Sequence, residues 1–126
     1  MVLKIQIKDK KDFYRYWLSI LQFAHKLTKR ESEALLLYIL KREELKKSIS
    51  DISLLRETLM SLRVRKEIVK EMNYSDHKIF YYNIINKLRK KKAFININGQ
   101  WDINATLMPK YSKDFNLTIE FVNKND

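Results

Sequence analysis

The segment from residue 63 to residue 94, RVRKEIVKEMNYSDHKIFYYNIINKLRKKKAF, restricts the possible folds more than any other part of the chain. Apolar residues recur at helical spacing on both sides of a short polar turn. They are Val64, Ile68, Val69 and Met72 before the turn, and Phe80, Ile84 and Leu88 after it. Two amphipathic helices joined so tightly must bury their apolar faces together and against a third element, so the segment predicts a helix-turn-helix inside a larger folded unit.

The turn between these helices needs a residue that tolerates a positive φ, and Asn73 occupies that position. Ser75 follows as the expected N-cap of the second helix. Asp76 then lies in the first helical turn, where the helix dipole favours an anion. We therefore expect the second helix to run from Asp76 to about Lys92.

A β-hairpin is predicted directly after the second helix. The strand-like runs FINI and QWDI are separated by Asn98-Gly99, the dipeptide that best fits a type I′ turn. Because Gly99 is the only glycine of the chain, its place between the two runs strengthens this prediction. A hairpin in this position completes the outline of a winged helix-turn-helix, with the hairpin as the wing.

Both ends of the chain predict short strands, because apolar and polar residues alternate there. The alternating apolar residues are Leu3, Ile5 and Ile7 near the start, and Phe115, Leu117, Ile119 and Phe121 near the end. We expect the two terminal strands to pair with each other or with the hairpin.

Three further helices are expected between the first strand and the helix-turn-helix. The first spans about residues 11–26 and carries aromatic residues around more than one face. The second opens at the capping box formed by Thr28 and Glu31, and the third is capped by Ser50 or Asp51.

Together these elements predict an α+β, mostly α, winged helix-turn-helix with about five helices, a C-terminal β-hairpin wing and short terminal strands. A length of 126 residues corresponds to one domain. Within it we assign residues 1–60 to a strand, helical support and an interface, residues 61–93 to the helix-turn-helix, and residues 94–126 to the wing and the C-terminal strand.

The charge favours a polyanionic partner such as nucleic acid. Lys and Arg number 26 against 15 Asp and Glu, which gives a net charge of +11. A chain rich in Lys and Asn from an AT-rich genome can also be basic without such a partner, and this alternative stays open. The absence of Cys favours an intracellular or intravirion location, and the absence of a long apolar run or a signal peptide favours a soluble protein without a membrane partner.

Enzyme signatures are missing from the sequence. It contains no Gly-rich phosphate loop, no GxSxG motif and no cluster of residues at metal-ligand spacing. His25 and His77, the only histidines, fall on separate predicted helices. We therefore predict a protein that is not an enzyme, with no catalytic residues, no metal and no cofactor.

Polar and basic residues lie opposite the apolar stripe of the second helix and at its end. We predict nucleic-acid contacts by Lys78, Tyr82, Asn83, Lys87, Arg89, Lys90, Lys91 and Lys92. These side chains are able to contact phosphates or base edges in the major groove, but Asp76 at the helix start and the lack of an Arg in the middle of the exposed face count against sequence readout. Cations also stabilise a helix C-terminus, so residues 89–92 are equally consistent with a solvated helix end.

The helix near the N-terminus carries more aromatic side chains than one core face can absorb. Aromatic residues at a surface are typical of protein interfaces. We predict an interface at Phe13, Tyr14, Tyr16 and Trp17. The alternative is that these side chains fill the core of a small domain.

Three segments of the chain resemble a known group of proteins. They are FYRYWLSILQFAHKLTKRESEALLLYILKREEL, RKEIVKEMNYSDHKIFYYNIINKLRKKKAF and INATLMPKYSKDFNLTIEF. With them the chain resembles small winged-helix proteins of tailed bacteriophages of Bacteroidetes, including crAss-like phages. The part LTKRESEAL also looks like the opening of many sigma-factor and LuxR-type DNA-binding domains. The chain departs from the commoner pattern at Asn73 and Ala93, where Gly often stands.

In such phages, helix-rich folds serve in the neck rings between portal and tail. The resemblance therefore implies a structural subunit of the virion, a head-tail connector ring protein that forms a cyclic homo-oligomer and contacts portal or tail components. A ring around DNA accounts for the basic charge through non-specific phosphate contacts. The alternative is a DNA-binding winged-helix transcriptional regulator in the host cytoplasm.

Overall fold

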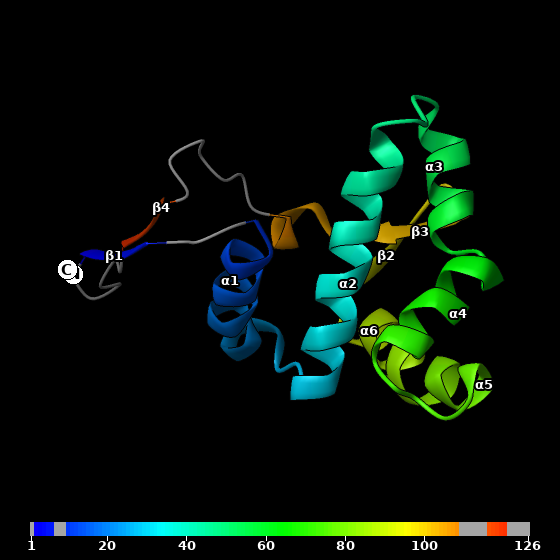
Figure 1. The fold of residues 1–126 in the computed structure, drawn as a ribbon, viewed down its shortest axis with the longest axis horizontal. Coiled ribbons are helices and arrows are strands. Elements are labelled where there is room, and N and C mark those ends of the chain that lie inside the picture. The colour runs from blue at the N-terminus through cyan, green and yellow to red at the C-terminus, as the bar shows by residue number, and fades with distance from the viewer. Residues whose placement is uncertain (1, 7–9, 109–115, 121–126) are drawn as a thin grey trace.

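The structure, a computed structural model, describes residues 2–6, 10–108 and 116–120. Most of these residues are helical (Figure 1). The helices are α1 (Lys10–His25), α2 (Lys29–Lys46), α3 (Ile52–Leu59), α4 (Leu62–Glu71), α5 (His77–Phe80) and α6 (Asn86–Lys90), with the π-helical segment η1 (Tyr81–Ile85) between the last two. Because α5, η1 and α6 follow one another without a break, they form one continuous helix, called the 77–90 helix below.

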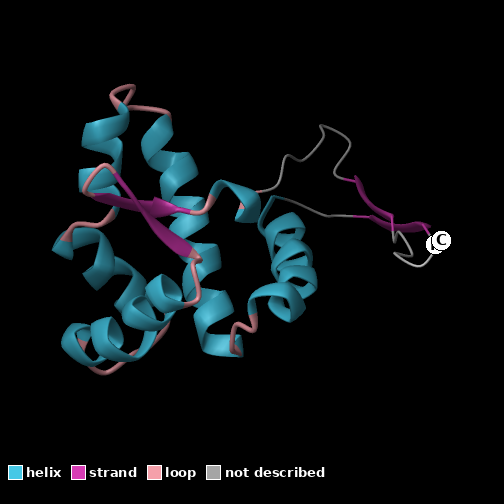
Figure 2. Cartoon of the chain, turned by 180° about the vertical axis from the view of Figure 1, so that it is seen from behind, coloured by secondary structure: helices cyan, strands magenta, loops and turns pink. Residues whose placement is uncertain are grey.

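The strands form two separate antiparallel pairs, coloured apart from the helices in Figure 2. Strand β1 (Val2–Gln6) pairs with β4 (Asn116–Glu120), and β2 (Phe94–Ile97) pairs with β3 (Gln100–Ile103), which leads into the short 3-10 helix η2 (Ala105–Leu107). The mostly α fold with a C-terminal hairpin is confirmed, and the terminal strands pair with each other. Of the residues expected in those strands, Ile7, Phe115 and Phe121 lie outside the described residues.

The predicted capping residues start the central helices. At α2, the Thr28 hydroxyl accepts a hydrogen bond from the Glu31 N–H at 3.2 Å, and the Glu31 carboxylate accepts one from the Thr28 N–H at 3.1 Å. This reciprocal pair confirms the capping box. Of the two residues expected to cap α3, Asp51 does so, by accepting a hydrogen bond from the Ser53 N–H.

The turn of the helix-turn-helix follows the prediction at Asn73 and differs from it two residues later. Asn73 has a φ of 54°, and the Tyr74 N–H closes the end of α4 by donating to the Val69 carbonyl at 2.9 Å. The prediction of Ser75 as N-cap is wrong, since Asp76 is extended and its carboxylate accepts from the Lys78 N–H at 2.6 Å. Asp is as good an N-cap as Ser, so the helix begins one residue later.

The 77–90 helix contains a π-turn, in which the Asn86 N–H donates to the Tyr81 carbonyl five residues earlier. An α-helical turn takes slightly fewer than four residues, and a π-helical turn takes slightly more. Side chains four residues apart therefore rotate slightly one way around the helix in the α-turns and slightly the other way in the π-turn, and the two rotations partly cancel. As a result the inward face stays aligned over its whole length. It buries Phe80, Ile84, Ile85 and Leu88, each at most 4% exposed.

The 77–90 helix ends earlier than expected. Its last helical residue is Lys90, and Lys92 takes the left-handed conformation with a φ of 64°. The Ala93 N–H then donates to the Leu88 carbonyl at 2.9 Å, which completes a Schellman-type end. The position that favours Gly is therefore Lys92, whereas Ala93 has a negative φ and is fully buried.

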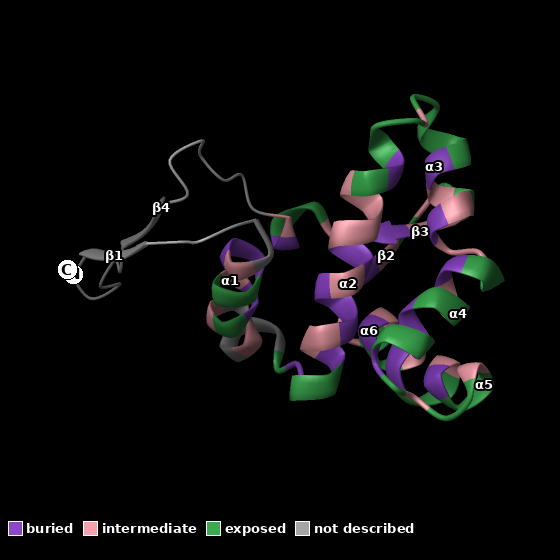
Figure 3. Ribbon diagram, viewed as in Figure 1, coloured by how far each residue is buried: buried purple, intermediate pink, exposed green. Residues whose placement is uncertain are grey.

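Helix α2 is the centre of the core. It packs against α1 on one side and against the helix-turn-helix on the other (Figure 1). Buried residues therefore lie on more than one face of α2 (Figure 3). Tyr38 is 2% exposed and meets the wing residue Phe94 edge to face, with ring centroids 5.1 Å apart.

The wing is the hairpin that the sequence predicts. Its two loop residues, Asn98 and Gly99, have φ values of 52° and 87°, as a type I′ turn requires. The Asn96 side-chain oxygen accepts a hydrogen bond from the Gly99 N–H at 2.9 Å. These contacts fix the register, with Ile97 opposite Gln100 and Phe94 opposite Ile103.

Candidate nucleic-acid interface

The side of the 77–90 helix away from the core forms a continuous exposed surface, called the outer face below. Its residues follow a spacing of four, because the π-turn keeps successive turns in line. They are the exposed Lys78, Ile79, Tyr82, Asn83, Lys87 and Lys90 and the half-buried Asn86. From residue 77 to residue 92 the chain has no acidic residue, so the surface has only positive formal charge.

The acid at the start of the helix is engaged by the backbone. Asp76 caps the helix, and its hydrogen bond from the Lys78 N–H lowers the pKa of the Asp76 carboxyl. The Asp76 side chain is exposed and its carboxyl group is charged, so a phosphate that approaches the first turn meets an anion there.

The eight predicted nucleic-acid contacts divide into two groups. Six side chains are exposed, and two are half-buried and engaged inside the protein. The exposed ones are Lys78, Tyr82, Asn83, Lys87, Lys90 and Lys92, and the engaged ones are Arg89 and Lys91.

Arg89 joins the helix to the wing. Its guanidinium lies over the Trp101 ring of β3 at 4.5 Å and over the Tyr81 ring at 5.2 Å. It also donates to the Tyr81 hydroxyl at 2.7 Å. Arg65 of α4 lies over the same Tyr81 ring at 4.9 Å, so one stack of alternating cations and aromatic rings runs from α4 to the wing.

Lys91 joins the end of the helix to the turn between α1 and α2. Its ammonium group donates to the Glu31 carboxylate and to the Lys26 carbonyl, the latter at 2.8 Å. The Glu31 residue is 4% exposed, and its carboxylate also completes the capping box of α2. The ammonium group of Lys91 is therefore held by the fold, away from the outer face.

A buried acid that the sequence analysis missed fixes the wing from the other side. Asp102 of β3 is 2% exposed and receives two hydrogen bonds from Arg42 of α2, at 2.9 and 3.1 Å, and one from Arg56 of α3 at 3.0 Å. Burial acts to raise the pKa of Asp102, but these bonds and one from the Ile103 N–H outweigh it and hold the pKa below its ordinary value. The only signal in the sequence is an acid inside the strand run QWDI.

No family model matches the chain, and no curated protein or solved structure was found to be similar to it. The geometry of the described residues is therefore the basis for a functional assignment.

The four predicted interface residues are not together on one surface. Phe13 and Tyr14 are 1% and 2% exposed and belong to the core, where their rings meet edge to face. Their burial, which follows from the packing of α1 on α2, conflicts with the predicted contact to a partner. Trp17 is half-buried against the core, and Tyr16 is 43% exposed. Tyr16 is the member of the set that a partner can reach.

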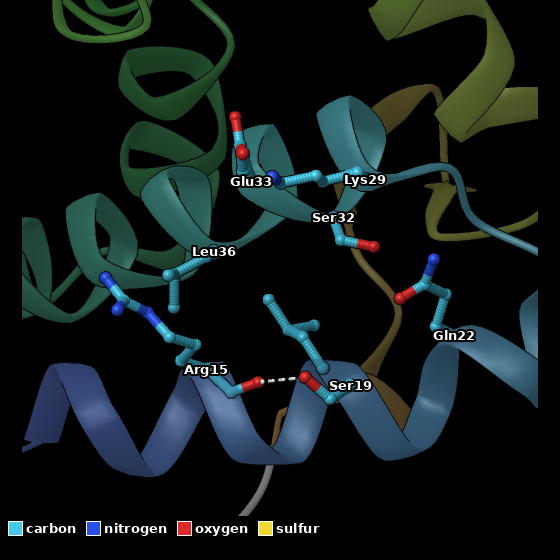
Figure 4. Close-up of a pocket in the computed structure, with 8 residues that line it drawn as sticks. Arg15, Ser19, Gln22, Lys29, Ser32, Glu33 and Leu36 are labelled. Carbon is cyan, nitrogen blue, oxygen red and sulfur yellow. Dashed lines mark hydrogen bonds between the residues drawn. The ribbon is translucent and has the colours of Figure 1, made fainter.

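A groove between α1 and α2 has a volume of about 400 Å³ (Figure 4). Polar side chains from both helices line it, together with Leu18 and Leu36. Its Ser19 hydroxyl donates to the Arg15 carbonyl of the same helix at 3.0 Å, and no His or Cys lines the groove. The described lining therefore offers no pairing of a nucleophile with a histidine base.

The described residues contain no group of three or more His, Cys, Asp or Glu side chains able to hold a metal ion. None of the helices in the described part of the chain combines the length and the apolar character that a membrane span requires.

Proposed function

We propose that this protein is not an enzyme and binds double-stranded DNA with the outer face of the 77–90 helix, chiefly through phosphate contacts. The observation that carries the proposal is that the fold engages Arg89 and Lys91 and leaves the other cations of this region exposed. Lys78, Lys87, Lys90 and Lys92 are exposed on or beside a helix that the turn and the wing leave uncovered. A helix presented in this way matches the geometry by which helix-turn-helix proteins enter the major groove.

Phosphate contacts supply most of the affinity expected from such a surface. Each lysine that neutralises a phosphate releases a counterion, so the affinity falls steeply as the salt concentration rises. The one arginine of the helix, Arg89, is engaged by Tyr81 and Trp101. Bidentate pairing of arginine with guanine is therefore not part of the proposed contacts.

The test compares two double variants with the same loss of charge. Lys87→Ala with Lys90→Ala removes two cations from the outer face, and Lys46→Ala with Lys47→Ala removes two exposed cations at the far end of α2. We expect the first pair to lower the slope of log affinity against log salt by about 1.8, and the second pair to leave the slope unchanged. The measurement is fluorescence anisotropy with a duplex at several salt concentrations. Equal slopes for both variants and the unaltered protein would refute the proposal.

As a second proposal, the protein is a structural subunit of a phage virion, a head-tail connector ring protein. This proposal concerns the setting in which the protein contacts DNA. It is supported by the β1 and β4 pair, which lies to one side of the helical body (Figures 1 and 2). Each of these two strands has a single partner within the part of the chain that the structure describes. A two-stranded ribbon is marginally stable alone and has free edges, so it is suited to pairing with a neighbouring subunit.

Native mass spectrometry of the protein from its source particle or cell tests this setting. A closed ring or incorporation into a virion supports the connector, with portal or tail components as neighbours. A monomer or dimer that co-purifies with DNA supports a transcriptional regulator in the host cytoplasm. For the connector, Tyr16→Ala is expected to weaken assembly without unfolding the subunit, because Tyr16 is 43% exposed.

A further inference from the structure

Two large apolar side chains of the outer face are exposed. Ile79 is 47% exposed and Tyr82 is 70% exposed, and they lie three residues apart, on adjacent turns of the helix. The other large apolar residues of the 77–90 helix are buried or half-buried, since the inward face already takes Phe80, Ile84, Ile85 and Leu88. Apolar surface in the N-terminal half of a face whose formal charges are all positive points to an apolar feature on the partner.

Two polar residues beside Ile79 and Tyr82 indicate which bases the helix can contact. Asn83 and Asn86 lie on the same face as Ile79 and Tyr82. A side-chain amide can pair with the N6 and N7 atoms of adenine in the major groove. The guanidinium that would favour guanine is held elsewhere, because Arg89 stacks on Tyr81 and Trp101.

The Tyr82 ring contacts the ring of its neighbour and borders a depression. Tyr81 and Tyr82 meet edge to face with ring centroids 6.1 Å apart. Together with Arg65 and Lys78 they border a shallow depression of about 270 Å³ between α4 and the 77–90 helix. Tyr82 thus forms one wall of a depression that Lys78 also lines, and the exposed ammonium group of Lys78 is suited to a phosphate that flanks a base pair.

The major groove offers one apolar group, the C5 methyl of thymine, and apolar side chains contact it. We propose that Ile79 and Tyr82 contact thymine methyl groups and that Asn83 and Asn86 pair with adenine, so that the protein prefers A·T-rich duplexes. This inference rests on the DNA binding proposed above and adds a base preference to it. The lysines of the same face supply the phosphate contacts.

Replacing thymine by uracil tests the inference, because the change removes the methyl group and leaves the base-pairing edge intact. Three duplexes of equal length are compared at one salt concentration: an A·T-rich duplex, the same duplex with deoxyuridine for thymidine, and a G·C-rich duplex. We expect the affinity to fall about fourfold for each methyl that is contacted, the factor that corresponds to burying one such group. The G·C-rich duplex is expected to bind more weakly than the A·T-rich duplex.

A matched pair of variants locates the effect. Ile79→Ala removes the apolar contact, whereas Ile52→Ala alters an isoleucine of nearly the same exposure, 46%, at the start of α3 and far from α5 in Figure 1. Ile79→Ala should reduce the difference between the thymine and uracil duplexes, and Tyr82→Ala should do the same. Ile52→Ala should retain the full difference. All three variants should keep the salt dependence of the unaltered protein.

The outcomes separate the proposal of DNA binding from the inference of thymine-methyl contacts. Failure to bind any duplex at low salt would refute DNA binding itself. Equal affinity for the thymine and uracil duplexes, with binding intact, would overturn the methyl contact and leave phosphate binding in place. A difference that survives both Ile79→Ala and Tyr82→Ala would mean that the methyl groups are contacted by another part of the protein, and would also overturn the inference.

Discussion

The two sides of the 77–90 helix use the same kinds of residue in different ways. Toward the wing and the core, Arg89 stacks on aromatic rings, and Lys91 donates to a buried carboxylate. On the outer face, Lys87 and Lys90 are exposed to solvent. Cations next to each other in the sequence thus divide between stabilising the fold and remaining available to a polyanion.

This difference has a simple geometric origin. Successive residues of a helix point about 100° apart, so a run of basic residues cannot place all its charges on one side. A count of positive residues in the run from 89 to 92 therefore overestimates the charge available for binding. Substitution of a cation that stabilises the fold should change stability, and substitution of a cation on the outer face should change the affinity for DNA.

The largest effect is expected at Asp102. Replacing it by Asn leaves the guanidinium groups of Arg42 and Arg56 without their buried carboxylate, which should lower the free energy of unfolding by about 3–5 kcal/mol. Glu44→Gln is the control, because Glu44 is 70% exposed and lies 3.8 Å from Lys41, and should change it by less than about 0.5 kcal/mol. Urea denaturation measures both. Similar values for the two variants would show that the buried cluster contributes little.

The same carboxylate should make stability depend on pH in acid. Its pKa in the folded protein lies below the ordinary value of 3.8, so its contribution is complete above about pH 4. The contribution is lost as the pH falls from there through the lowered pKa of the folded state. Thermal unfolding between pH 5 and pH 2 should therefore show a shallower loss of stability for Asp102→Asn than for the unaltered protein, and parallel curves would contradict this.

A smaller effect is expected for Arg89, with its neighbour as the contrast. Arg89→Ala removes two cation–π contacts and a hydrogen bond, which should lower the free energy of unfolding by about 2 kcal/mol. Lys90→Ala should change stability by less than about 0.5 kcal/mol and lower the salt slope of DNA binding by about 0.9. If Arg89→Ala lowered the slope equally, its guanidinium would be a phosphate contact after all.

The smallest effect is expected at the end of the helix and has the opposite sign. Lys92 has a φ of 64°, which is unfavourable for residues other than Gly, so Lys92→Gly should raise the free energy of unfolding by about 1 kcal/mol. Lys92→Ala removes the same charge without relieving the backbone and should not stabilise. Comparing the melting temperatures of the two variants isolates the backbone contribution, and equal melting temperatures would count against it.

The sequence predicted the elements of the fold well where local chemistry decides the outcome. The capping box at Thr28, the left-handed turn at Asn73 and the hairpin at Gly99 each depend on residues close together in the chain. The N-cap moved from Ser75 to Asp76 because two adjacent residues suit that position equally.

The candidate site was harder to predict, because it depends on contacts distant in sequence. The engagement of Arg89 requires Trp101 of the wing, and that of Lys91 requires Glu31 of α2. The exposure of Ile79 could have been foreseen, since it directly precedes Phe80 of the buried stripe and so points to another side of the helix. The burial of Phe13 and Tyr14 depends on how α1 packs on α2, which periodicity alone does not determine.

The Asp102 cluster also bears on the order in which the protein folds. The contacts of Asp102 with Arg56 and Arg42 span 46 and 60 residues of sequence, whereas the hairpin that carries it closes over a two-residue loop. Hairpins form within about 1–10 µs, but contacts of long sequence separation must wait for the helices to assemble. We therefore expect the wing to form early and to be fixed late, so that loss of Asp102 mainly accelerates unfolding and leaves the folding rate nearly unchanged.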